Sequence, residues 1–252
     1  MHFLHKIFIG FLILWNTDGY PYRHPGYGSP YHPSYDRGFR WEYSSSYSRY
    51  RCFSGDSVVR LSNGTYKQID RLQSSDQILT REHSKVITTE MIMMLDKHTS
   101  GKALFYTLIT YSGHQISLTE HHLIPIVDSN GNDTYLFAKH VQIGDQLIVL
   151  INDTLDYSPV MNITIEMKKQ YYAPLTMTGT LFVNDIFASC FANVRDHRFA
   201  QYSMTPFRVY YKLARYLSIA EPFHTHQREG IHWTARMMLY FARYFRADVL
   251  IL

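Results

Sequence analysis

A pattern of residues that repeats after 69 positions most restricts what this chain can fold into. Residues 63–66 read Asn-Gly-Thr-Tyr and residues 132–135 read Asn-Asp-Thr-Tyr, and under the same shift residues 73–79 match residues 142–148. Asn-Gly between short apolar segments is a strong signal for a two-residue β-hairpin turn. Two copies of one hairpin unit predict a β domain with pseudo-twofold symmetry. The alternative is an ordinary β domain in which two hairpins happen to be similar.

Short apolar segments separated by turn residues extend this pattern. The strands expected from them cover residues 58–61, 65–67, 77–80, 86–88, 104–111, 115–118, 123–127 and 146–150. Turns are expected at Ser112-Gly113 and Asn130-Gly131. Many short strands with regular turns predict an all-β fold.

After about Asp196 the pattern becomes helical. Thr205 is the expected N-cap, with Pro206 at the first helical position. A second helix is expected over residues 233–245, where arginines interrupt the apolar character and argue against a transmembrane span. This helix could dock on the core, lie on a membrane surface or line a lipid site.

The N-terminal part of the chain differs in character from the rest. Residues 7–15 form an apolar run that is too short to span a bilayer and is typical of a signal peptide over residues 1–19; a buried N-terminal helix is the alternative. Residues 20–51 hold eight tyrosines among Pro, Gly, Ser and Arg, with almost no aliphatic residues. Such a segment buries too little apolar surface to fold, so a disordered Tyr/Pro-rich secreted peptide is predicted. The chain is therefore expected in the secretory pathway, with processing in the endoplasmic reticulum, and then outside the cell or at its surface.

Composition narrows the functional classes. Hydrophobic residues make up 46% of the 252 residues, which supports a real core, and the net charge of +4 is scattered, which argues against a nucleic-acid partner. Asn-x-Ser/Thr acceptors at Asn63, Asn132, Asn152 and Asn162 would mark exposed loops in a secreted chain. Two cysteines are too few for a disulfide scaffold, although one Cys52–Cys190 bridge remains open and would mask Cys52 until it is reduced.

Cys52 stands where the disordered segment gives way to the folded one. Its thiol can reach the carbonyl carbon of Arg51 through a five-membered ring and replace the Arg51–Cys52 amide by a thioester. Because the nucleophile is tethered, effective molarities on the order of 10⁵ M are within reach. Self-cleavage at this bond is the first hypothesis that the sequence supports.

An amide is more stable than a thioester, so the fold must assist the cleavage. A histidine that protonates the departing amine is worth roughly 10²–10⁴-fold, and His121 and His122 are candidates that would face opposite sides of an extended segment. The residues alone do not choose between them. Asp96 could act as the base for an alcohol that resolves the thioester, with a raised pKa if it is buried; a structural residue at a strand end or in a turn is the alternative.

Five motifs in order resemble the autoprocessing (Hint) domain of hedgehog and hedgehog-related proteins over about 200 residues from Cys52 to the C-terminus. They are Cys52-Phe53-Ser54, the aspartate-bearing segment around Asp96, Thr119-x-x-His122, Ala188-Ser189-Cys190-Phe191-Ala192 and Gly230-Ile231-His232-Trp233. The resemblance implies a flat, pseudo-twofold, all-β disc with a C-terminal helical sterol-recognition region.

The resemblance also implies a role for each matching residue. Cys52 would be the nucleophile, and Thr119 and His122 would assist the N-to-S acyl shift. Asp96 would activate a sterol hydroxyl, and Cys190 would be a second thiol able to pair reversibly with Cys52. No cofactor is implied, and cholesterol or another sterol or membrane lipid would be the co-substrate and partner.

The expected organisation is a signal peptide (1–19), a secreted peptide (20–51), an autoprocessing domain (52–195) and a helical sterol-recognition region (196–252). Two features depart from the family. Arg51 stands where the family usually has glycine, which can slow the shift or change the acceptor. Residues 20–51 bear no resemblance to the hedgehog signalling domain, so the released product would be a short Tyr-rich peptide that could associate with membranes.

The expected function is autocatalytic cleavage with transfer of the peptide to a sterol; a close variant ends in hydrolysis or transfer to another lipid. Intein splicing is disfavoured because no terminal Asn precedes a Cys, Ser or Thr acceptor. A papain-like protease is disfavoured because Cys52 lacks that family's surrounding motif. The alternative from another class is a Tyr/Pro-rich extracellular matrix or signalling protein whose β domain is inactive.

Overall fold

A computed structural model describes residues 53–128, 130–219, 221–223 and 229–234. The chain divides into Met1–Ser45 and Ser46–Leu252, and every described residue belongs to the second unit. The expected signal peptide, the peptide 20–51, Arg51 and Cys52 lie outside the described residues, as does the expected second helix beyond Thr234.

Antiparallel pairing joins all the described strands into one network. The strands are β1 (Phe53–Ser54), β2 (Val58–Arg60), β3 (Tyr66–Gln68), β4 (Gln77–Glu82), β5 (Lys85–Thr110), β6 (Gln115–Thr119), β7 (Leu123–Val127), β8 (Asp133–Phe137), β9 (Gln146–Ile151), β10 (Thr154–Thr176), β11 (Thr180–Val183), β12 (Ile186–Ser189) and β13 (Gly230–Ile231). The short 3-10 helices η1 (Ile69–Arg71) and η2 (Ala138–His140) precede β4 and β9. The all-β prediction is confirmed.

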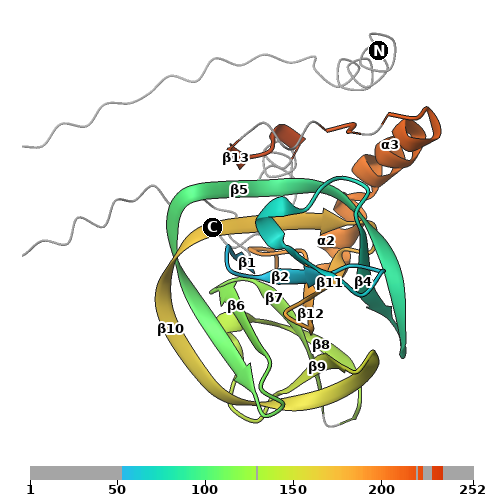
Figure 1. The fold of residues 1–252 in the computed structure, drawn as a ribbon. Helices are drawn as coiled ribbons and strands as arrows, with labels where there is room; N and C mark the ends of the chain where they lie inside the picture. Colours follow the sequence, from blue (N-terminus) through green and yellow to red (C-terminus); the bar gives the residue numbers. More distant parts are fainter. Residues whose placement is uncertain (1–52, 129, 220, 224–228, 235–252) are drawn as a thin grey trace, which may run out of the picture. The chain divides into compact units, whose positions relative to one another are not determined.

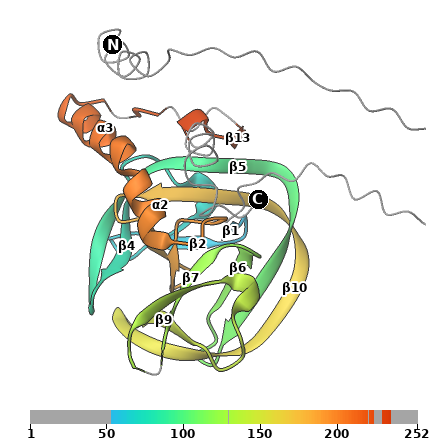
Figure 2. The same ribbon diagram turned by 180° about the vertical axis from the view of Figure 1, so that it is seen from behind.

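The strands β5 and β10 pair along most of their length and curve together around the shorter strands (Figures 1 and 2). Register shifts, such as the one between Lys169 and Tyr171, bend the pair. The expectation of two separate strands at 86–88 and 104–111 was wrong, because β5 is continuous through the polar residues 97–102. Those residues pair with β10, and a local pattern does not reveal such a distant partner.

The duplication is present in the structure. A shift of 69 residues carries η1 onto η2, β4 onto β9 and the first residue of β5 onto the first residue of β10. The loop hydrogen bonds follow the same shift: Ser75 N donates to Met91 O at 2.9 Å, and Gly144 N donates to Val160 O at 2.8 Å. Both donors have a positive φ, of 76° at Ser75 and 99° at Gly144. The pseudo-twofold prediction is therefore confirmed.

The expected turns are found where the sequence places them, with positive φ at Gly64, Gly113 and Gly131. Asn63, Asn132 and Asn152 lie in exposed connections between strands. The fourth acceptor does not fit the loop expectation, because Asn162 is an exposed residue within β10. Strand pairing with β5 on one edge leaves its side chain facing outward.

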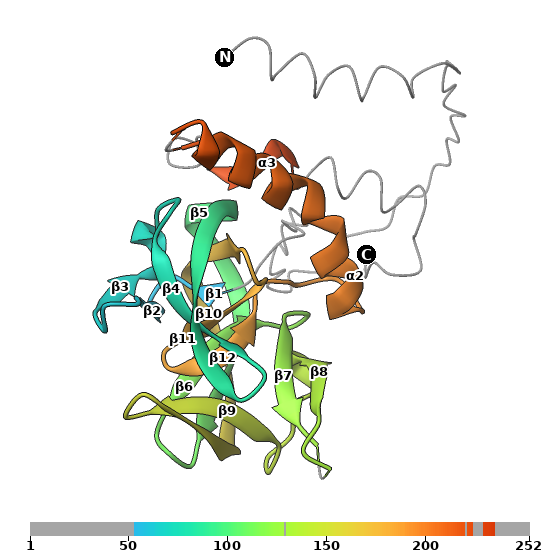
Figure 3. The same ribbon diagram turned by 90° about the vertical axis from the view of Figure 1, so that its right-hand side faces the viewer.

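Two helices, α2 (His197–Ser203) and α3 (Thr205–Tyr216), follow each other on one side of the strands (Figure 3). Asp196 caps α2 by accepting hydrogen bonds from Arg198 N and Phe199 N. The expected cap at Thr205 is wrong: Met204 precedes α3 in a helical conformation, since it also ends α2. No helix in the described part of the chain is long and apolar enough to cross a membrane.

Candidate active site

The strand β1 enters the middle of the sheet. Phe53 pairs with Leu118 of β6 on one side and with Tyr172 of β10 on the other. The Phe53 side chain is fully buried, and its ring centroid lies 4.6 Å from that of His122 with an interplanar angle of 61°. The residue that follows Cys52 in the chain is thus in direct contact with one of the two candidate histidines.

His122 is completely buried, and its two ring nitrogens differ. Nε2 lies 2.9 Å from the carbonyl oxygen of Ser189, which can only accept, so Nε2 carries the hydrogen. Nδ1 then holds the lone pair, and it has no hydrogen-bond partner within the described residues. Burial lowers the pKa of His122 to about 3, although the Ser189 bond partly opposes this. The site therefore contains a neutral imidazole with an unused basic nitrogen.

His121 has a different environment. Its Nδ1 lies 3.3 Å from the Glu120 carboxylate and its Nε2 lies 2.7 Å from Lys139 Nζ, near the surface. The two histidines diverge because residues 120–121 form a turn between β6 and β7. The two side chains do point in different directions, as expected. The expected cause was wrong, because the segment is a turn and not an extended strand.

Thr119 ends β6 and is buried beside this turn. Its carbonyl oxygen accepts a hydrogen bond from the His122 backbone N at 2.9 Å. Thr119 and His122 are therefore joined through the main chain. The two residues between Thr119 and His122 in the Thr-x-x-His motif are the two residues of this turn.

The segment with the second cysteine lies against His122. Besides the Ser189 contact, Ala192 forms an isolated β-bridge with His122. Cys190 is buried, its Sγ lies 3.6 Å from Thr176 Oγ1, and burial raises the pKa of its thiol to about 11. Cys190 is thus a protonated thiol at neutral pH, one residue from the carbonyl that orients His122.

Asp96 lies inside β5 and not at a strand end or in a turn. Its side chain is fully buried, and its Oδ1 lies 3.3 Å from Nε2 of the half-exposed His98. The neighbouring strand on one side is β13, in which Ile231 pairs with Asp96, so the tail motif at 230–233 lies directly beside it. His232 N also donates to Leu95 O at 2.8 Å. Sequence reasoning missed His98 because no strand was expected over residues 96–98; within β5 the two residues share one face.

The strand β10 connects the two halves of the site. Tyr172 pairs with Phe53 on one side and with Lys97 on the other, and the next residue, Ala173, pairs with Asp96. The strand β10 therefore lies between Phe53 on β1 and Asp96 on β5. Thr119, His122 and Cys190 gather on the β6 side, whereas Asp96 comes from the β5 and β13 side.

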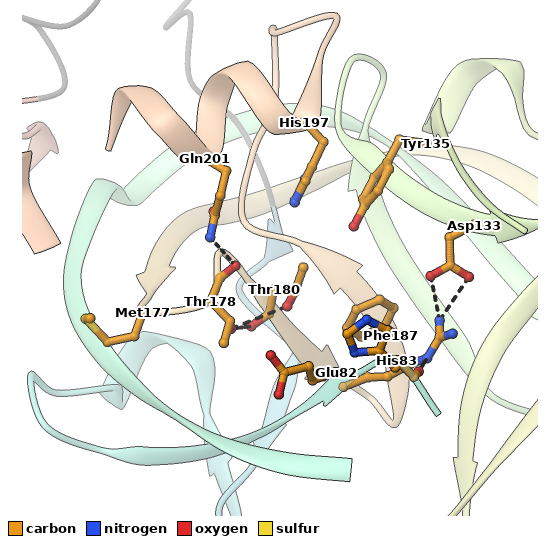
Figure 4. Close-up of a pocket in the computed structure, with 11 residues that line it drawn as sticks. Glu82, His83, Asp133, Tyr135, Met177, Thr178, Thr180, Phe187, His197 and Gln201 are labelled. Carbon is orange, nitrogen blue, oxygen red and sulfur yellow. Dashed lines mark hydrogen bonds and ion pairs between the residues drawn. The ribbon is translucent and has the colours of Figure 1, made fainter. Parts of the chain in front are cut away.

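A polar pocket of about 460 Å³ lies beside α2, next to this site (Figure 4). Its walls hold the Arg81–Asp133 ion pair and the stacked rings of Tyr135 and His197, with Gln201 bound to Thr178 O. None of the residues expected at the site lines the pocket. His197 is a contact that the sequence reasoning missed, because nothing distinguishes it among fourteen histidines.

The buried state of His122 predicts a pH effect on stability. Its pKa falls from 6.5 to about 3 on folding, so between these values the unfolded chain binds a proton that the folded chain does not. The contribution of His122 to the free energy of unfolding is therefore fully present above about pH 6.5. It falls by roughly 1.4 kcal/mol per pH unit as the pH drops below this value. We expect His122→Gln to lose part of the decrease in unfolding free energy between pH 7 and pH 4.5, measured by urea titration. An unchanged decrease in this variant would contradict the assignment.

Comparisons with known proteins agree with these features. Residues 40–246 match the family model described as the Hint module. Sonic hedgehog protein of Danio rerio is 30% identical over 199 residues, which cover 74% of this chain and 47% of that protein. Protein hedgehog of Drosophila melanogaster is 27% identical over 199 residues, with coverage of 74% and 42%. The chain thus spans less than half the length of these curated relatives.

The comparison with solved structures found inteins. A DnaB intein from Synechocystis sp. PCC 6803 has a TM-score of 0.48 and 18% identity, covering 55% of this chain and 96% of that one. The gp41-1 intein has a TM-score of 0.45 and 18% identity, covering 55% and 97%.

Proposed function

Because this chain belongs to the Hint module family and carries a hedgehog-related Hint domain, we propose that it cleaves its own Arg51–Cys52 bond and transfers the N-terminal peptide to a sterol. The observation that carries this is the neutral, fully buried His122, whose ring touches Phe53. Phe53 follows Cys52 directly in the sequence, and this adjacency supports His122 as the proton-transfer group for the Arg51–Cys52 bond.

In the first step the Cys52 sulfur attacks the carbonyl carbon of Arg51. His122 Nδ1 takes the thiol proton, while Nε2–H remains bound to Ser189 O. The bond between the Arg51 carbon and the Cys52 nitrogen then breaks, and the imidazolium returns the proton to the departing amine. Since burial disfavours the imidazolium, Nδ1 is a weak base and its conjugate acid is strong, so His122 holds the proton only briefly while passing it from the thiol to the amine. The products are a thioester at Arg51 and a free amine at Cys52.

Thr119 and Cys190 support this step in different ways. Thr119 holds the turn that aims His122, through its carbonyl bond to the His122 backbone. Cys190 is the proposed redox partner: exchange with a small external disulfide would join Cys52 to Cys190 and release two small thiols, which removes the nucleophile, and a small dithiol such as dithiothreitol would restore both thiols. The raised pKa of Cys190 keeps this thiol protonated and makes it a poor nucleophile at neutral pH.

In the second step an alcohol resolves the thioester. Asp96 accepts the hydroxyl proton, the alcohol oxygen attacks the Arg51 carbonyl carbon, and the Cys52 thiolate leaves, so that an ester forms. The tail motif at 230–233 pairs with β5 at Asp96, which favours an acceptor delivered by residues 196–252. We propose cholesterol or a related sterol, handed on in the secretory pathway, with a lipidated Tyr-rich peptide as product.

Substitution of Asp96 should separate the two steps. Asp96→Ala is expected to keep cleavage by dithiothreitol, since this thiol supplies its own thiolate, and to lose cleavage by cholesterol, whose hydroxyl is a very weak acid. The assay follows one mutant with two acceptors on a gel over hours. The control is Asp56→Ala, which removes an exposed carboxylate near β1 and should keep both reactions. Loss of both reactions in folded Asp96→Ala would make Asp96 a first-step or structural residue, and retention of both would remove it from the mechanism.

A further inference from the structure

Ser189 contacts the buried His122 and the half-buried His197 through two different atoms. Its carbonyl oxygen accepts from His122 Nε2 at 2.9 Å, and its hydroxyl oxygen lies 3.1 Å from Nδ1 of His197. Ser189 itself is fully buried at the end of β12, and His197 is the first residue of α2. One residue thus links α2 to the nitrogen that sets the tautomer of His122.

The direction of these hydrogen bonds follows from their donors. Phe191 N donates to Ser189 Oγ at 3.0 Å, which leaves the hydroxyl hydrogen and one lone pair for other partners. In the tautomer of His197 that carries its hydrogen on Nε2, the Ser189 hydroxyl donates to Nδ1. Among the described residues, His197 Nδ1 is the acceptor within hydrogen-bonding distance. Burial and, to a lesser extent, the Arg208 charge lower the pKa of His197 to about 4, so the ring is neutral and can accept at neutral pH.

His197 is held in place from several sides. Its ring stacks on Tyr135 of β8 with centroids 4.1 Å apart and planes 11° from parallel, as the close-up in Figure 4 shows. Phe191 contacts the same ring edge-on at 5.4 Å. Asp196 fixes the start of α2 by capping it. The acceptor that His197 presents to Ser189 is therefore rigid.

We infer that His197 is a positioning residue for His122: it anchors the Ser189 hydroxyl, so that the Ser189 carbonyl stays aligned and keeps the hydrogen of His122 on Nε2. The consequence is that Nδ1 of His122, in the ring that contacts Phe53, remains the nitrogen with the lone pair. The effect on reaction rate rests on the proposed function, whereas the effect on the His122 tautomer does not.

Two substitutions separate the acceptor of His197 from its ring. His197→Phe keeps an aromatic ring to stack on Tyr135 but has no acceptor for Ser189. His197→Asn gives up the stacking but places an amide oxygen near the former Nδ1 position. We expect His197→Phe to slow dithiothreitol-induced cleavage of the full chain about tenfold, the value of one buried hydrogen bond, and His197→Asn to restore most of the rate. Equal rates in the two variants would overturn the inference.

The His122 tautomer is measured independently of cleavage. Ring-nitrogen NMR is recorded on the full chain with Cys52→Ala, which keeps it whole, and the His122 signals are assigned by their loss in His122→Gln. We expect one protonated and one bare nitrogen in the parent and in His197→Asn, and exchange between tautomers in His197→Phe. A folded His197→Phe chain with the parental tautomer would refute the role of His197.

A third variant covers the case in which His197→Phe does not fold. Ser189→Ala removes the hydroxyl itself and is expected to produce the same tautomer exchange and the same loss of rate; an unchanged tautomer there also refutes the inference. In a chain that carries both His197→Phe and Ser189→Ala, the decrease in cleavage rate should equal that of either single variant, because both substitutions break the same hydrogen bond. Absence of cleavage in the parent would count against the proposed function alone, since the NMR measurement still decides this inference.

Discussion

The Cys52→Ala chain is expected to show no fragment that begins at residue 52, with or without dithiothreitol or cholesterol. The side chain of residue 52 is placed to form a five-membered ring with the Arg51 carbonyl, and alanine has no nucleophile to do so. Loss of the tether removes an effective molarity on the order of 10⁵ M, which no external thiol replaces. Intact-mass analysis of residues 20–252 after purification measures the result.

The matched control is Cys190→Ala, which removes the other thiol of the chain. Cys190 is buried and protonated, so its removal should leave thiol-induced cleavage under reducing conditions in place. A wild-type fragment that ends at Arg51 and carries one added sterol would support both proposed steps. Continued release of the C-terminal fragment from Cys52→Ala would show that another group attacks this bond.

Replacing His122 by alanine should slow dithiothreitol-induced cleavage by roughly 10²-fold, the usual contribution of a positioned proton-transfer group. The same change at His121 should have little effect, because His121 contacts Glu120 and Lys139 near the surface. The two variants differ by one position and remove the same side chain, so each controls for the other. The measurement is the first-order rate of fragment formation in both proteins.

Stability must be measured beside these rates, since His122 is fully buried and its loss leaves a cavity. The His122→Gln variant resolves this point: it keeps a donor for Ser189 O but lacks a basic nitrogen. We expect it to fold well and cleave as slowly as His122→Ala. Equal rates in the His121 and His122 variants would mean that neither acts in proton transfer.

Local patterns in the sequence determined much of the fold. Hairpin turns at Gly64 and Gly131 need a positive φ, which glycine adopts without strain, so these positions are readable from the residues alone. The repeat after 69 residues carried the pseudo-twofold organisation, because each copy encodes the same turn, 3-10 helix and strand.

Other features were decided by the tertiary structure. The two predicted strands of β5 became one because β10 pairs with the polar residues between them. Thr205 does not cap α3, because the preceding residue, Met204, ends α2 in a helical conformation and takes the cap position. In both cases a partner or neighbour outside the local window supplied the hydrogen bonds.

The same holds for the chemistry of the site. The residues alone left His121 and His122 open and the family resemblance pointed to His122; the packing of Phe53 and the burial of His122 supply the physical difference between them. The hydrogen on Nε2 is set by a carbonyl 67 residues away in the chain, and His197 reaches that residue from a separate helix. Sequence patterns report on neighbours within a turn or a strand, whereas protonation states depend on burial and on hydrogen-bond partners that come together only when the sheet is assembled.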